Sequence, residues 1–205
     1  MTTKRLFKVF APAALCVAFC GALFAQEPNC DEIAAMARMA RAKSSAALTA
    51  EKQKAGNSYR AQVIFAARSL EFHRMERRAA VQLLNLIPKD DGQQNTLMTL
   101  GDSLCNSETV SDMKSLGRLA EGLPHGLARA VLLVPNKLPD YVAYALISTQ
   151  DPHSDYAVQM QTVCRGKHSE FMKAVDELPS DKRGWFIKHV FNPQGCRALA
   201  LPEAE

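Results

Sequence analysis

Apolar residues along this chain recur at the spacing of helices rather than of strands. Ile33, Met36, Ala37 and Ala40 mark one face of a helix, because residues three and four positions apart lie on the same side. Few stretches alternate strictly between apolar and polar residues, and none of them lies between hairpin turns. The pattern therefore predicts an all-α protein of about eight helices, without a strand.

Prolines, glycines and capping residues divide this pattern into separate helices, and Ser58 and Asp151 are among the predicted N-terminal caps. The expected helices cover residues 30–54, 59–87, a short stretch from 95, 107–123, 126–134, 139–148, 151–165, 168–178 and 180–191. An Ile-Pro or Leu-Pro pair recurs at 87–88, 123–124, 138–139 and 178–179. We expect an irregular orthogonal bundle. A short HEAT-like α-solenoid is the alternative, because two of the three steps between these pairs have the length of such a repeat.

The longest helical pattern, residues 59–87, is both amphipathic and basic, and its polar middle, residues 71–78, is a place where the helix can bend or break. Val63, Ala67 and Leu70 begin its apolar stripe. Five arginines occupy the remaining surface: Arg60, Arg68, Arg74, Arg77 and Arg78. A helix of this kind usually presents a solvated face of a bundle, and contact with an anionic membrane surface is the alternative.

Residues 1–25 have the order of an export signal, in which a basic head precedes an uncharged apolar run and small residues. The basic residues are Lys4, Arg5 and Lys8. We expect cleavage after Ala25 or after Ala22. The mature protein would then be a single all-helical domain, residues 26–200, with a disordered tail at 201–205, located in the periplasm or outside the cell.

The charge of the mature chain argues against nucleic acid as a partner. The full sequence has 25 basic and 21 acidic residues and a net charge of +4. Loss of the three basic residues of the signal leaves a nearly neutral protein. Such a protein lacks the excess of positive charge that would bind the negatively charged backbone of a nucleic acid. A protein partner fits this composition, and membrane contact is not expected once the signal is cleaved.

Four cysteines remain after removal of the signal: Cys30, Cys105, Cys164 and Cys196. An even number of cysteines in an exported chain predicts two disulfides. Three pairings are open, and we favour Cys30–Cys105 with Cys164–Cys196. The first bond would hold the N-terminal helix, and the second would hold the C-terminal end.

A candidate for a metal site lies in the region from Asp151 to His168. His153, Asp155 and His168 are its candidate ligands, and Cys164 precedes His168 by one helical turn. Cys164 is also needed for a disulfide, which lowers this expectation. Motifs for haem attachment, zinc proteases, P-loops and dinucleotides are absent from the sequence, so no cofactor is expected.

Residues 101–104, Gly-Asp-Ser-Leu, resemble the nucleophile block of GDSL-type esterases, and the resemblance covers these four residues alone. It would make Ser103 a nucleophile. That family pairs its serine with an Asp-x-x-His block, which this sequence lacks, and a serine without a base is a weak nucleophile. We therefore expect no catalytic residue here.

These observations together predict an exported, non-catalytic helical protein that acts by binding, as an adaptor or scaffold of the cell envelope. One alternative is a metal-binding protein or enzyme that uses the region from Asp151 to His168. The other is a membrane-surface protein that uses the basic helix over residues 59–87.

Overall fold

The computed structural model describes residues 30–72, 76–90, 92–94, 110–149 and 152–199. Several expectations lie outside these residues: the signal at 1–25, the short helix from 95, Ser103, Cys105, Asp151 and the tail at 201–205. In the described part the protein is mostly helical, which confirms the predicted all-α class.

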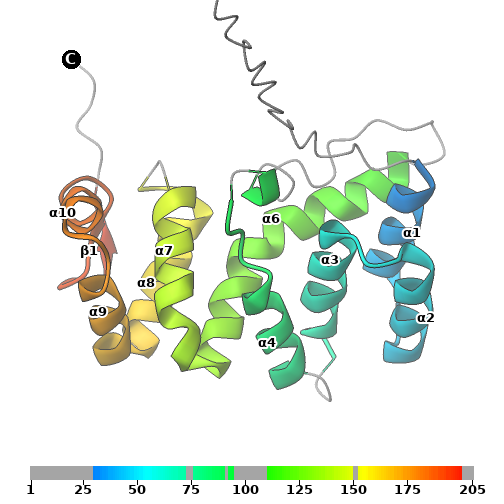
Figure 1. Ribbon diagram of the computed structural model, residues 1–205, viewed down its shortest axis with the longest axis horizontal. Coiled ribbons are helices and arrows are strands. Elements are labelled where there is room, and N and C mark those ends of the chain that lie inside the picture. The colour runs from blue at the N-terminus through cyan, green and yellow to red at the C-terminus, as the bar shows by residue number, and fades with distance from the viewer. Residues whose placement is uncertain (1–29, 73–75, 91, 95–109, 150–151, 200–205) are drawn as a thin grey trace, which may run out of the picture.

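Residues 92–94 are helical, and the described residues also give the bounds of nine α-helices and one 3₁₀ turn. They are α1 (Cys30–Arg41), α2 (Ser45–Ala55), α3 (Tyr59–Ser69), α4 (Glu76–Asn85), α6 (Val110–Leu133), the 3₁₀ turn Pro135–Lys137, α7 (Leu138–Ser148), α8 (Asp155–Gly166), α9 (His168–Asp176) and α10 (Ser180–His189). Figure 1 shows α1 and α2 at one end of the long axis and α9 and α10 at the other, with α6 running from α1 past α3 to α4.

The N-terminal pattern predicted as one helix, residues 30–54, is two helices. Chain direction changes at residues 42–44, and Ser44 begins the new helix, since its side chain accepts a hydrogen bond of 3.2 Å from the Ala47 amide. A serine in this position satisfies an amide that no helical carbonyl can reach. The predicted cap at Ser58 is confirmed, because its hydroxyl accepts a bond of 3.1 Å from the Ala61 amide at the start of α3.

The basic pattern over residues 59–87 is also interrupted. Helix α3 ends at Ser69 and α4 begins at Glu76, so the pattern forms two helices rather than one. Arg60 is 6% exposed, whereas Arg77 and Arg78 are exposed on α4. Arg74 lies outside the described residues, and the other four arginines of the pattern are divided between α3 and α4.

Helix α6 is longer than expected because Pro124 lies inside it rather than at its end. Proline lacks the amide hydrogen of a regular helical turn, so it usually ends or bends a helix. Here the apolar residues on both sides, Leu116, Leu123 and Leu127, are buried against neighbouring helices. Their burial on both sides of Pro124 holds one 24-residue helix, where the sequence predicted two.

Two clusters of buried side chains form the interior. The smaller one joins α1, α2, the start of α3 and Leu116 of α6, and the larger one joins α3, α4 and the rest of α6 to α7–α10. Helix α6 packs on α1, α3, α4, α7 and α8, and thus links the two clusters. The single long α6 differs from the equal hairpins of a HEAT-like repeat, whereas the succession of helices along the long axis is a feature of α-solenoids. The choice between an irregular bundle and a short HEAT-like solenoid therefore stays a prediction.

The C-terminal end contains a short hairpin, although the sequence predicted no strand. Strand β1 (Phe191–Asn192) pairs antiparallel with β2 (Arg197–Ala198). Two residues are too few to show a pattern of alternation.

The residue that caps the N-terminus of α8 differs from the predicted one. Ser154 holds the first turn by accepting a bond of 3.3 Å from the Ala157 amide, whereas Asp151 was predicted to do so.

Candidate functional site

A groove with a volume of about 420 Å³ lies between α1, α3 and α6. This volume is within the range of sites that bind ligands or peptide segments. We call it the arginine groove, after the four arginines among its lining residues: Arg41, Arg68, Arg118 and Arg129. Glu71 is the acidic residue of the lining.

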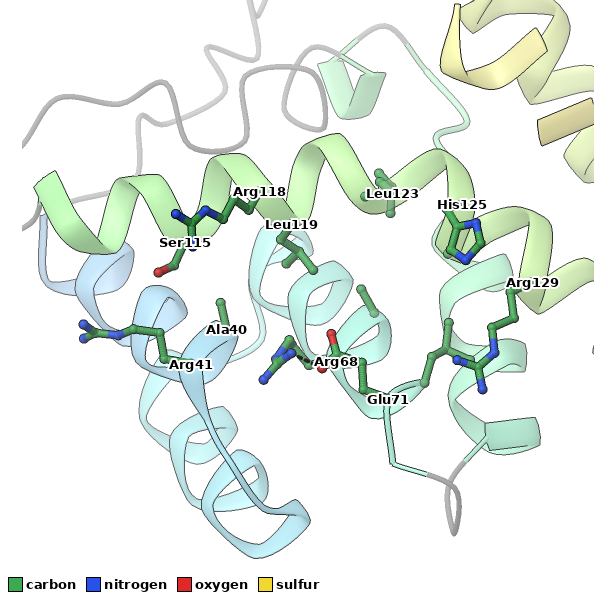
Figure 2. Close-up of a pocket in the computed structure, with 14 residues that line it drawn as sticks. Ala40, Arg41, Arg68, Glu71, Ser115, Arg118, Leu119, Leu123, His125 and Arg129 are labelled. Atoms are coloured by element: carbon green, nitrogen blue, oxygen red, sulfur yellow. Dashed lines mark hydrogen bonds and ion pairs between the residues drawn. The ribbon is translucent and has the colours of Figure 1, made fainter. Parts of the chain in front are cut away.

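Each of the three helices supplies the groove with one of its faces. Arg41 lies in the last turn of α1, and Arg68 lies in the last turn of α3. On α6 the lining residues Ser115, Arg118, Leu119, Gly122, Leu123, His125, Gly126 and Arg129 recur at steps of three and four. This spacing places them along one side of the helix. Figure 2 shows Arg41 and Arg129 at opposite ends of the site, with Arg68 and Glu71 between them.

The arginines differ in the ion pairs and hydrogen bonds that they form within the protein. Arg68 donates to the Ala42 carbonyl at 2.8 Å and forms an ion pair with Glu71. Its Nε is buried and has no hydrogen-bond partner among the described residues. Arg129 forms an ion pair with Glu76 of α4.

Arg118 is exposed, and no ion pair of Arg118 occurs within the described part of the chain. Its guanidinium stays close to water and keeps its five donors for an incoming acceptor. Arg118 is therefore the member of the groove best placed to bind an anionic group from solution.

The floor of the groove is apolar and open. Ala40, Ala67 and Leu119 line it beside Gly122 and Gly126. A Cβ atom added at Gly122 would meet no atom within 4 Å, so the absence of a side chain there keeps the groove wide. The site thus combines apolar surface with cationic groups at its ends and edges, which suits a ligand that has both kinds of group.

The predicted metal ligands are only partly brought together. His153 is exposed in the turn before α8, Asp155 is the first residue of α8, and His168 is the first residue of α9. Among the described residues, the potential ligands that cluster are Cys164, His168 and Cys196, whose donor atoms lie within 4.8 Å of one another. His153 and Asp155 do not belong to this cluster.

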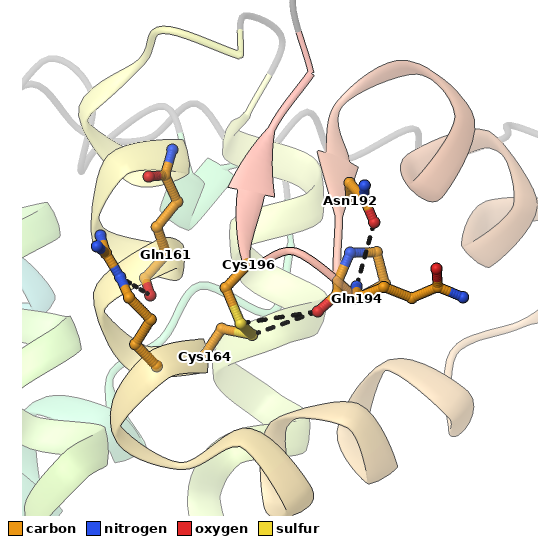
Figure 3. The surroundings of a disulfide bond; sticks show 7 residues. Gln161, Cys164, Asn192, Gln194 and Cys196 are labelled. Carbon is orange, nitrogen blue, oxygen red and sulfur yellow. Dashed lines mark hydrogen bonds between the residues drawn. A yellow bond between two sulfur atoms is a disulfide. The ribbon is translucent and has the colours of Figure 1, made fainter.

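The predicted bond between Cys164 and Cys196 is present. Figure 3 shows that it joins α8 to the turn between β1 and β2. Cys30 is exposed and has no disulfide partner in the described residues. Cys105 lies outside them, so the Cys30–Cys105 bond stays a prediction.

Sequence reasoning missed the arginine groove. Its signal was present on α6, where Arg118, Gly122, His125 and Arg129 follow a helical step. The predicted break at Pro124 divided this face between two helices. Arg41 and Arg68 are contributed by α1 and α3, and their approach to α6 depends on tertiary packing.

No family model, curated protein or solved structure matches this chain. In residues 30–72, 76–90, 92–94, 110–149 and 152–199, no helix is both long enough and apolar enough to span a bilayer.

Proposed function

We propose that this protein is an exported, non-catalytic binding protein that holds an acidic, extended segment of a partner protein in the arginine groove. The observation that carries the proposal is the groove itself, in which four arginines surround an apolar floor between α1, α3 and α6. Arginine is the side chain best suited to carboxylates, because its planar guanidinium donates two parallel hydrogen bonds.

The distribution of charge favours an extended ligand over a compact anion. A single phosphate or sulfate is held by donors that converge on one point. Here Arg41 and Arg129 lie at opposite ends of the site, and the ion pairs with Glu71 and Glu76 already engage Arg68 and Arg129. A peptide with spaced carboxylates and apolar side chains matches both the separated cations and the apolar floor.

Two further observations support export. The N-terminal pattern is that of a secretory signal. The disulfide between Cys164 and Cys196 is of a kind that persists in oxidising compartments and is rare in the cytosol. A binding role in the cell envelope is consistent with both.

Binding of a fluorescein-labelled peptide of repeating Glu-Glu-Leu units, followed by anisotropy, tests the proposal. We expect Gly122→Leu to abolish binding, because the new side chain would enter the groove from a position where an added Cβ meets no atom within 4 Å. Arg118→Gln should weaken binding about three- to fivefold, the effect of losing up to about 1 kcal/mol from one exposed charge pair.

Two matched variants serve as controls. Gly117 also lies on α6 with no atom within 4 Å of an added Cβ, but it does not line the groove, so Gly117→Leu should bind like the unmodified protein. Arg165 is an exposed arginine on α8, and Arg165→Gln should also have no effect. Equal affinity for a Lys-Lys-Leu peptide, or unchanged binding by Gly122→Leu, would contradict the proposal.

A further inference from the structure

Three potential metal ligands meet at the end of the molecule opposite the α1–α2 pair. Cys164 lies near the end of α8, His168 begins α9, and Cys196 lies in the turn between β1 and β2. Their donor atoms, two sulfurs and an imidazole nitrogen, lie within 4.8 Å of one another. They come from three separate elements, so the fold rather than a local sequence motif brings them together.

The surroundings of the three side chains are those of a half-open site. Both cysteines are buried, and each sulfur lies 3.7 Å from the carbonyl oxygen of Pro193. His168 is exposed, so one side of the cluster faces solvent. A metal held here would have protein ligands on one side and access to water on the other, which is the arrangement of a zinc site with an open fourth position.

We propose that the reduced protein binds one zinc-like divalent ion through Cys164, His168 and Cys196, and that the disulfide is the metal-free form of the same site. A dithiol reductant supplies two electrons and two protons to the sulfur–sulfur bond, becomes a disulfide itself and leaves two cysteine thiols. Binding of the ion then releases both thiol protons, because the thiolate is the form that ligates metals. Metal and disulfide therefore exclude each other.

The distances permit this exchange without a change of fold. Zinc–sulfur bonds of about 2.3 Å in tetrahedral geometry place two thiolates about 3.8 Å apart. The Cα atoms of Cys164 and Cys196 are 5.7 Å apart, which is close enough for both side chains to reach one ion between them. The imidazole of His168 lies within the same 4.8 Å and completes three ligands.

Cobalt substitution tests this site directly. The full chain, with Cys16, Cys20, Cys30 and Cys105 replaced by Ser, is reduced with a phosphine under anaerobic conditions and titrated with Co²⁺. We expect one ion per chain, with thiolate-to-cobalt charge transfer in the near ultraviolet and the intense visible bands of tetrahedral cobalt. Zinc should displace the cobalt and bleach these bands. Oxidised protein should show none of them.

Variants separate this site from the metal site predicted from sequence. His168→Ala should weaken Co²⁺ binding at least about tenfold, since it removes one of three ligands. His153→Ala and Asp155→Asn should bind like the parent, because neither residue belongs to the cluster.

Circular dichroism in the same titration shows whether the reduced chain is helical before the ion binds or becomes helical on binding. Appearance of the cobalt bands supports the site in both cases. Absence of thiolate-to-cobalt charge transfer in the reduced protein would overturn the proposal. An unchanged affinity in His168→Ala would also overturn it. The groove and its peptide play no part in this test, so the two proposals fail independently.

Discussion

At the scale of single residues, the buried tyrosines differ in whether their hydroxyl groups form hydrogen bonds. The hydroxyls of Tyr144 and Tyr156 lie 2.8 Å apart, and their rings meet edge to face at 5.4 Å. Tyr59 donates to the Leu86 carbonyl at 2.7 Å. The hydroxyl of Tyr141 is fully buried and has no partner within the described residues. Burial raises the pKa of Tyr141 and Tyr156 above the usual range, so both hydroxyls are neutral.

Replacement of these tyrosines by phenylalanine should therefore have different effects. Tyr156→Phe removes a hydrogen bond and should lower the free energy of unfolding by about 1 kcal/mol. Tyr141→Phe removes a buried polar group that has no described partner, so it should be neutral or stabilising by up to about 1 kcal/mol. Urea denaturation of both variants checks this, and an equal loss of stability in the two would contradict it.

At the scale of elements, one acidic side chain connects α1 with α2. Glu51 of α2 accepts a bond of 3.3 Å from Arg38 of α1 and one of 3.1 Å from Lys54 in its own helix. Burial acts to raise the pKa of Glu51, but the hydrogen bonds and charges of Lys54 and Arg38 outweigh it and lower the pKa below its ordinary value of 4.5. The folded state thus favours the ionised carboxylate.

This lowered pKa gives the joint between α1 and α2 a defined pH dependence. A carboxyl group whose pKa is lower in the folded than in the unfolded state stabilises the fold above the unfolded pKa, and this contribution is lost as pH falls through the folded pKa. Glu51→Gln should therefore lower the free energy of unfolding by less than about 1 kcal/mol at neutral pH. The difference should vanish in acid, below the lowered pKa.

Urea denaturation across this pH range measures the effect. Glu121→Gln, at an exposed position of α6, serves as the control and should show no comparable pH-dependent difference. A Glu51→Gln penalty that persisted unchanged in acid would show that the side chain acts through packing rather than through its charge.

At the scale of the whole molecule, the disulfide lies at the end where the fewest side chains are buried. Helix α6 connects both clusters of buried residues, whereas α10 contributes only Phe186 as a buried side chain. The disulfide closes a sequence separation of 32 residues at this thinly packed end. A cross-link of this length restricts the unfolded chain and stabilises the fold by that route.

Opening the bond should lower the free energy of unfolding by about 2–4 kcal/mol. Cys164→Ser, Cys196→Ser and the double variant should each lose about the same amount, because any one of them opens the bond. Denaturation of the three oxidised proteins measures this. Additive losses in the double variant would show that the cysteines contribute separately and not through a shared bond.

Features that depend on neighbouring residues in the sequence, such as helix faces and caps, could be predicted. Features that depend on tertiary packing could not. The spacing of Ile33, Met36 and Ala37 predicted their burial, and Ser58 marked the start of α3. The extent of α6 could not be predicted, because the tertiary contacts on both sides of Pro124 maintain the helix despite the missing hydrogen bond.

For the candidate sites, the Cys164–Cys196 bond was predicted by counting cysteines in a sequence that begins with the pattern of an export signal, together with their positions. The arginine groove required knowledge of which helices meet, and no local pattern carries that information. The same holds for the approach of His168 to both cysteines, since Cys196 is contributed by a hairpin too short to be recognised.

The disulfide also determines what a protease leaves behind. Lys173 and Lys182 are exposed between the two cysteines, and α10, with little buried surface, is a region where local opening requires few contacts to break. A cut at either lysine divides the chain, but the bond between Cys164 and Cys196 keeps both pieces together. The nicked molecule would migrate as one species until a reductant releases its C-terminal fragment.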